Sequence, residues 1–149
     1  MIAAPVSSAP ARRRTRILCA DDDPMIRRVV TITLEADGFD VCTVADGDAA
    51  YEEALRHHPD VVVLDIMMPG RDGYDVLRAL RENPETADVP VVLLSAKATD
   101  AEVWEGWKAG ADYYMTKPFN PTELTDFLGY LTAQDAAALA PVIPMRVTT

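Results

Sequence analysis

Apolar and polar positions fall in blocks along the chain, and the most sharply bounded block covers residues 61–65. Three valines and a leucine run directly into Asp65, and a Pro69-Gly70 break follows soon after. A continuous apolar run bounded by turn residues is typical of a strand buried on both faces of a parallel sheet. We therefore expect Asp65 at the carboxyl end of a central strand, where open α/β sheets bind ligands. On this segment alone, a structural role for Asp65 in capping the strand end has equal weight.

The same patterns predict alternating strands and helices along most of the chain. We expect strands over residues 16–20, 40–44, 60–65, 89–94 and 112–115. We expect helices over about residues 24–36, 46–56, 74–81, 98–109 and 121–132, the last continuing toward Leu139. Such alternation predicts an α/β fold with a parallel sheet, right-handed crossovers and five helices on its two faces. A five-stranded doubly wound sheet most often takes the flavodoxin-like order 2-1-3-4-5.

The two ends of the chain lack this periodicity. We expect residues 1–15 to be a disordered basic arm and residues 16–133 to be the folded domain. Residues 134–149, which contain Pro141 and Pro144, are expected to form a helix extension and a flexible tail. The stretch after the last expected helix is too short for a second domain, so we expect a stand-alone domain.

Composition places the chain among ordinary soluble proteins. Its 149 residues suit one domain, and 49% of them are hydrophobic while 26% are charged. No apolar run is long enough to cross a bilayer and none resembles a signal peptide, so we expect a cytoplasmic protein that does not enter a membrane. Cys19 and Cys42 each fall in an expected strand, where they are predicted to be small apolar core residues.

Charge is unevenly distributed along the chain. The net charge is −10, and because four arginines are the only charges in the first sixteen residues, the remainder carries −14. An acidic body argues against direct nucleic-acid binding by the folded domain. The arginine cluster has the composition of a solubilising tail, although it could also contact an acidic surface.

Polar residues follow four of the expected strands. They are the three aspartates at positions 21–23, then Asp65, Ser95 and Lys117. In the order 2-1-3-4-5, the four strands concerned are adjacent, so their carboxyl ends converge. Two carboxylates ~4 Å apart repel by about 4 kcal/mol at an effective dielectric near 20, so a cation is expected among them. An acidic helix cap before Pro24 accounts for one or two of the three aspartates, but not for all.

This set of residues suits phosphoryl chemistry. Clustered carboxylates with a fixed backbone carbonyl suit Mg²⁺, which takes one or two carboxylates together with phosphate oxygens. A carboxylate such as Asp65 forms acyl-phosphate intermediates as a nucleophile. Lys117 supplies a cation and Ser95 a hydroxyl donor for phosphoryl oxygens.

The motifs that carry these residues resemble the receiver domain of two-component response regulators. The resemblance spans about residues 16–132, within the domain expected over 16–133. It rests on ILCADDDP at 17–24, DIMMPGRDG at 65–73, LSA at 94–96 and GADYYMTKPF at 110–119. Ser95 replaces the threonine that is commoner in the family, and it keeps the hydroxyl.

The resemblance implies a phospho-acceptor and a metal site. Asp65 would take a phosphoryl group from the phosphohistidine of a sensor kinase or phosphotransfer protein. Asp22 would bind Mg²⁺ directly, Asp21 would bind it directly or through water, and Asp65 and the Met67 backbone carbonyl would complete the protein ligands. Asp23 stands at a position that is usually acidic in the family.

The resemblance also implies a switch. Lys117 would pair with the phosphoryl group, and Ser95 would bond it and be drawn inward after phosphorylation. Tyr114 would be the aromatic switch that turns inward as Ser95 moves, although Tyr113 stands where an aspartate is frequent. The protein would then signal through protein contacts rather than act as a turnover enzyme.

The expected readout surface combines the helix over 98–109, the fifth strand and the last helix. It would contact a downstream protein or a second copy of the chain. Trp104 and Trp107 lie on this helix, three residues apart, and we expect one to be buried and the other partly exposed. An exposed tryptophan there would anchor a partner.

Three other functions fit parts of the sequence. A metal-dependent phosphatase with an aspartyl nucleophile often needs a second acid two residues later, where this chain has Met67. A nucleotide or flavin binder would carry a glycine-rich phosphate loop, which the sequence lacks. A degenerate receiver that acts without phosphate is disfavoured because the acidic, serine and lysine residues are all present.

Overall fold

The computed structural model describes residues 14–96 and 99–132. The sheet contains β1 (Arg16–Ala20), β2 (Asp40–Val44), β3 (Val61–Asp65), β4 (Val91–Ser95) and β5 (Tyr113–Thr116). The helices of the described residues are α2 (Pro24–Ala36), α3 (Gly47–His57), α4 (Gly73–Glu82), α5 (Asp100–Ala109) and α6 (Pro121–Leu131). All strands pair in parallel in the order β2-β1-β3-β4-β5. The predicted fold class and strand order are therefore confirmed.

The element boundaries differ from the expected ones by a few residues. The fourth strand begins at Val91 rather than at residue 89, and the proline at position 90 has no N–H to give to a sheet ladder. The last helix ends at Leu131. The expected arm over residues 1–15 lies almost wholly outside the described residues. So do residue 98, where we expected the fourth helix to begin, the continuation of the last helix toward Leu139, and the tail.

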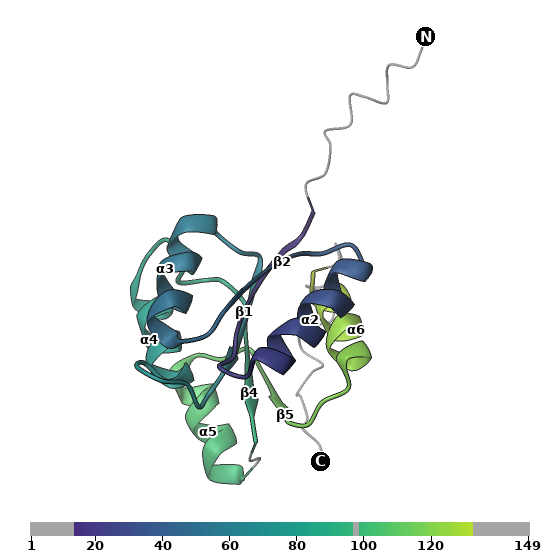
Figure 1. The fold of residues 1–149 in the computed structure, drawn as a ribbon. Coiled ribbons are helices and arrows are strands. Elements are labelled where there is room, and N and C mark those ends of the chain that lie inside the picture. The colour runs from purple at the N-terminus through teal and green to yellow at the C-terminus, as the bar shows by residue number, and fades with distance from the viewer. Residues whose placement is uncertain (1–13, 97–98, 133–149) are drawn as a thin grey trace.

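Helices cover both faces of the sheet. Figure 1 shows α3, α4 and α5 on one face and α2 and α6 on the other. The buried residues form two separate apolar clusters, one for each face. Successive residues of β3 alternate between the clusters, so that Val62 and Leu64 pack on one side and Val61 and Val63 on the other. This explains why the strand is apolar at every position before Asp65.

Side-chain caps fix the first turns of the helices near the carboxyl ends of the strands. Asp23 caps α2, Asp46 caps α3, Thr99 caps α5 and Asn120 caps α6, each with a side-chain oxygen that accepts a backbone N–H. Such caps satisfy N–H groups that lack helical partners. They hold the loops between strand ends and helices, where the polar residues of the sequence motifs lie.

The remaining sequence expectations concern cysteines and membranes. Cys19 is fully buried and Cys42 partly buried, and neither forms a disulfide. Burial raises the pKa of the Cys19 thiol to about 12, so this thiol stays protonated and unreactive. None of the helices described is long and apolar enough to span a membrane.

Candidate functional site

The carboxyl ends of four neighbouring strands bring the predicted site residues together. The sheet register places Asp65 of β3 opposite Leu94 of β4, next to Ser95. Ser95 in turn lies opposite Thr116 of β5, next to Lys117, whose N–H donates to the Ser95 carbonyl at 2.7 Å. The predicted convergence at one edge of the sheet is therefore confirmed.

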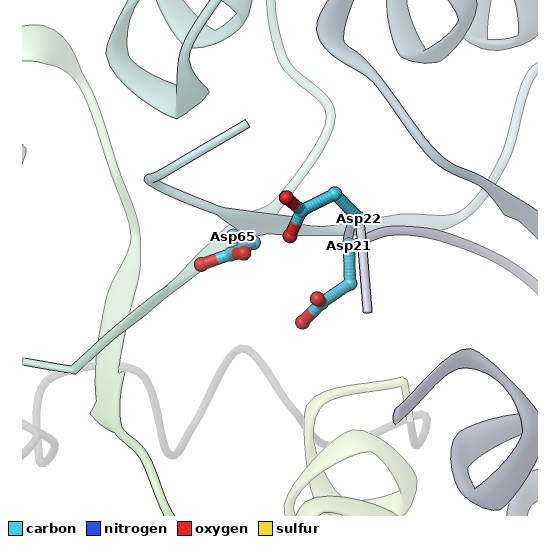
Figure 2. A group of neighbouring side chains, drawn as sticks. All are labelled: Asp21, Asp22 and Asp65. Carbon is cyan, nitrogen blue, oxygen red and sulfur yellow. The ribbon is translucent and has the colours of Figure 1, made fainter. Parts of the chain in front are cut away.

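Three carboxylates form an acidic cluster at this edge. One oxygen from each of Asp21, Asp22 and Asp65 lies within 4.8 Å of the others. Figure 2 shows Asp21 and Asp22 side by side after β1, with Asp65 facing them from β3. Asp21 is 0% exposed and Asp65 is 4% exposed, whereas Asp22 is exposed. The cluster therefore has a buried side and a side open to solvent.

Lys117 compensates the buried side of this cluster. Its Nζ lies 2.8 Å from Asp21 Oδ2 and 3.3 Å from Asp65 Oδ2. Burial alone would lower the pKa of Lys117, but the hydrogen bond and charge of Asp21, together with those of Asp65, raise it overall. Lys117 therefore remains a cation held between the two carboxylates.

Asp21 is fixed by its neighbours, and Asp23 has a separate role. The Asp23 N–H donates to Asp21 Oδ1 at 3.0 Å, and the Arg27 guanidinium donates to the Asp21 carbonyl at 2.9 Å. The Asp23 side chain accepts the Met25 N–H at 2.9 Å and caps α2. One of the three consecutive aspartates is thus a helix cap and two belong to the cluster, within the range expected from sequence.

The environment of Asp65 changes its acidity. Burial raises the pKa of its carboxyl from 3.8 to about 6, and the nearby charge of Asp21 acts in the same direction. The Lys117 ammonium and a hydrogen bond from the Met67 backbone lower the pKa in part. At neutral pH, Asp65 is therefore mostly ionised, which is the nucleophilic form of a carboxyl group.

The residues present fit a hard divalent cation. Asp21 Oδ2 is buried, and its negative charge is compensated by the Lys117 ammonium 2.8 Å away. An oxygen of this kind beside two further carboxylates matches the ligand preference of Mg²⁺. Asp21, Asp22 and Asp65 are the side chains that would hold the ion. The role of the Met67 carbonyl stays a prediction.

Ser95 and Tyr114 share a hydrogen-bonding partner that the sequence did not reveal. The Ser95 hydroxyl donates to Glu102 Oε1 at 3.2 Å, and the Tyr114 hydroxyl donates to the same oxygen at 3.3 Å. Thr99 and Glu102 have the spacing of a helix capping box, a signal that points only to helix capping. The contact between Glu102 and Ser95 depends on how α5 packs on the sheet, which the sequence pattern does not specify.

The structure separates the two adjacent tyrosines. Tyr114 is buried in the cluster under α5, on the face where Ser95 meets Glu102. Tyr113 points to the other face, where its ring packs edge-on against Phe127 with centroids 4.6 Å apart. Of the two, Tyr114 is therefore the one placed to respond to a movement of Ser95, and its role as the switch stays a prediction.

The expectation of one buried tryptophan on α5 is wrong. Trp104 is 62% exposed and Trp107 is 37% exposed. The side of α5 that faces the sheet carries Gly106, where an added Cβ would lie 3.0 Å from Leu93 Cδ1. Because the helix packs through this glycine, both tryptophans are turned toward solvent.

Comparison with known proteins shows the family to which the chain belongs. Residues 17–128 match the family described as the response regulator receiver domain. The chain belongs to this family. It is thus a receiver domain of the two-component type, and this membership argues against the phosphatase and nucleotide-binding alternatives.

The receiver domain is similar to several named regulators. It is 44% identical over 111 residues to the DNA-binding response regulator MtrA of Mycolicibacterium smegmatis, covering 74% of this chain and 47% of MtrA. Among solved structures, it is similar to the chemotaxis response regulator CheY4 of Vibrio cholerae, with a TM-score of 0.76, 31% identity, and coverage of 80% of this chain and 99% of CheY4. The Francisella response regulator 1452 receiver domain matches with a TM-score of 0.74 and 36% identity, over 79% of this chain and 96% of the other.

The chain spans about half the length of the curated relatives it matches. DNA binding is named for those whole proteins. Our sequence-based expectation that this receiver domain does not contact nucleic acid directly therefore stays a prediction.

Proposed function

We propose that this receiver domain is a phosphorylation-activated switch whose phospho-acceptor is Asp65. The observation that carries the proposal is the position of Asp65, which is buried at a strand end between two acidic neighbours and a paired lysine. A carboxylate held in this way is ionised at neutral pH and has a cation 3.3 Å away to receive phosphoryl charge. The partners that supply the phosphoryl group would be a histidine kinase or a phosphotransfer protein.

The transfer step follows from these groups. An Asp65 oxygen attacks the phosphorus of the donor phosphohistidine, an O–P bond forms, and the P–N bond breaks. The electron pair of that bond stays on the donor imidazole, which takes up a proton, and Asp65 becomes an acyl phosphate. Lys117 stabilises the charge on the phosphoryl oxygens. When bound at the acidic cluster, Mg²⁺ would supply further positive charge for the same oxygens.

The acyl phosphate would carry roughly −1.5 to −2 of charge in place of the single negative charge of the Asp65 carboxylate, and the surroundings of Asp65 must accommodate the added charge. Ser95 and Tyr114 are the groups that would respond, because Ser95 adjoins the acceptor and both hydroxyls share one partner. The output surface would be formed by α5, β5 and α6, and it would bind a downstream protein or a second copy of the chain. The exposed Trp104 would supply an anchor at this surface.

Intact mass spectrometry after incubation with acetyl phosphate tests the proposal. We expect the native chain to gain one phosphoryl group in the presence of Mg²⁺ and none after chelation. The Asp65→Asn variant should gain none under either condition. An equal adduct in this variant would contradict the assignment of Asp65, and catalytic turnover of unrelated phosphate monoesters would favour the phosphatase alternative.

A further inference from the structure

The Glu102 carboxylate links the phosphorylation site to helix α5. Its Oε1 accepts hydrogen bonds from Ser95 at 3.2 Å and from Tyr114 at 3.3 Å. Ser95 belongs to the strand end beside Asp65, while Tyr114 belongs to β5. Glu102 lies in the first turn of α5, which Thr99 caps by accepting the Glu102 N–H. One side chain therefore connects two strands to the start of a helix.

Other contacts hold this turn of α5 in place. The Tyr74 hydroxyl of α4 donates to the Glu102 carbonyl at 3.1 Å. One turn further on, Gly106 lets the helix approach the sheet, since a Cβ there would lie 3.0 Å from Leu93 Cδ1 and 3.2 Å from Tyr114 Cδ2. Glu102 is thus anchored through its backbone while its carboxylate reaches toward Ser95.

Ser95 has a single hydroxyl hydrogen, so its donor bonds compete. While this hydrogen is donated to Glu102, it is not available to a phosphoryl oxygen on Asp65. A bond to an ionised carboxylate is stronger than one between neutral groups. Any rearrangement in which Ser95 turns to the phosphoryl group must therefore first give up a favourable bond to Glu102.

We propose that Glu102 is a positioning residue that holds Ser95 and Tyr114 in the unphosphorylated arrangement and so opposes the switch, an inference that rests on the function proposed above for Asp65. Loss of the Ser95 bond would leave the Glu102 carboxylate with its Tyr114 bond and so change what the first turn of α5 contacts. Because Trp104 and Trp107 lie on the same helix, the state of Glu102 is coupled to the exposed surface of α5.

Binding of beryllium trifluoride, a phosphoryl analogue that adds to an aspartate carboxylate, tests this inference. Titration with Mg²⁺ present would be followed by the fluorescence of the two tryptophans on α5. We expect Glu102→Ala to bind the analogue about five- to tenfold more tightly than the native chain, since one hydrogen bond to a charged group no longer has to be broken. Glu105→Ala is the matched control, because Glu105 lies on the same helix, is exposed, and pairs only loosely with Lys108 at 3.9 Å.

Two further variants make the outcome specific. Glu102→Gln keeps the size and an acceptor oxygen but loses the charge, so it should tighten binding about two- to threefold without a cavity. In a Ser95→Ala background, substitution of Glu102 should have a smaller effect, because only its bond to Tyr114 is then lost. Equal affinities for the Glu102→Ala and Glu105→Ala variants, or a gain that is undiminished without Ser95, would overturn the role of Glu102. Absence of analogue binding by the native chain would instead contradict the assignment of Asp65 itself.

Discussion

At the residue scale, the site depends on two buried carboxylates that share one lysine. Asp21 and Asp65 lie at the ends of adjacent strands, and Lys117 pairs with both. Burial, together with the charge of Asp21, outweighs the Lys117 ammonium, so the pKa of Asp65 is raised to about 6. In the absence of a metal ion, burying the two carboxylate charges therefore lowers the stability of the folded protein. Binding of a metal ion or a phosphoryl group would change this electrostatic contribution.

Because the buried charge of Asp65 is unfavourable, we predict that Asp65→Asn stabilises the metal-free protein at neutral pH. The Asp65 pKa is higher in the folded than in the unfolded chain, so the folded state binds more protons between about pH 4 and 6. The unfolding free energy of the native chain should therefore fall as pH rises through this window, and the Asn variant should lack this fall. We expect the variant to be more stable by about 1–3 kcal/mol at pH 7, and similar to the native chain near pH 4.

Urea unfolding with a chelator at the two pH values measures this difference. Asp126→Asn, on an exposed position of α6, is the control and should change stability little. If the native chain were more stable than the Asp65→Asn variant at pH 7, the prediction would be wrong. The attraction of Lys117 for the Asp65 charge would then exceed the combined unfavourable effects of burial and of Asp21.

The sequence predicted these residues better than it predicted their partners. The positions of Asp21, Asp65 and Lys117 follow from strand ends and strand order, which the apolar runs reveal. The contact of Glu102 with Ser95 depends instead on the closeness of α5 to the sheet, and capping spacing alone does not indicate it.

At the scale of elements, close packing at particular glycines positions the site. The Gly73 N–H donates to the Ile66 carbonyl at 2.9 Å, at the start of α4. A Cβ on Gly73 would lie 2.6 Å from the Asp65 carbonyl oxygen and 2.8 Å from Ile66 Cα. Helix α4 therefore begins directly against the backbone of the acceptor strand. The packing of α5 through Gly106 explains in the same way why the predicted burial of one tryptophan was wrong.

Gly73→Ala is accordingly expected to be destabilising. The neighbouring atoms belong to the backbone and cannot rotate away, so we expect a loss of about 2 kcal/mol in unfolding free energy. Gly129→Ala in α6 is the matched control, because nothing lies within 4 Å of its added Cβ. At position 129, the better helix propensity of alanine should raise the unfolding free energy by up to about 1 kcal/mol. Chemical denaturation gives the unfolding free energies of the two variants. Equal changes in the two variants would contradict the close contact at Gly73.

At the scale of the whole molecule, strand order is what creates the site. The order β2-β1-β3-β4-β5 makes neighbours of strands that are far apart in sequence, and their polar ends meet at one edge. The alternating pattern of strands and helices was sufficient to predict this order and the resulting cluster. Burial, which distinguishes Asp21 from the exposed Asp22, required the three-dimensional structure.

Metal binding at this edge should stabilise the fold as a whole. Above its dissociation constant, Mg²⁺ is expected to raise the unfolding free energy by about 1.4 kcal/mol per tenfold increase in concentration. Asp22→Asn should weaken this response, whereas Asp23→Asn should preserve it, because asparagine also caps helices. Urea unfolding over a series of Mg²⁺ concentrations compares these adjacent substitutions. Equal responses would contradict the assignment of Asp22 to the metal site.

The most direct test of the account is to locate the phosphoryl group on the chain. Borohydride reduces an aspartyl phosphate to homoserine, which peptide mass spectrometry then identifies by position. After treatment with acetyl phosphate and Mg²⁺, we predict homoserine at residue 65 and unmodified aspartate at residues 21–23. Homoserine at one of those aspartates, or a stable phosphoryl group on Ser95, would contradict the claim that Asp65 is the acceptor.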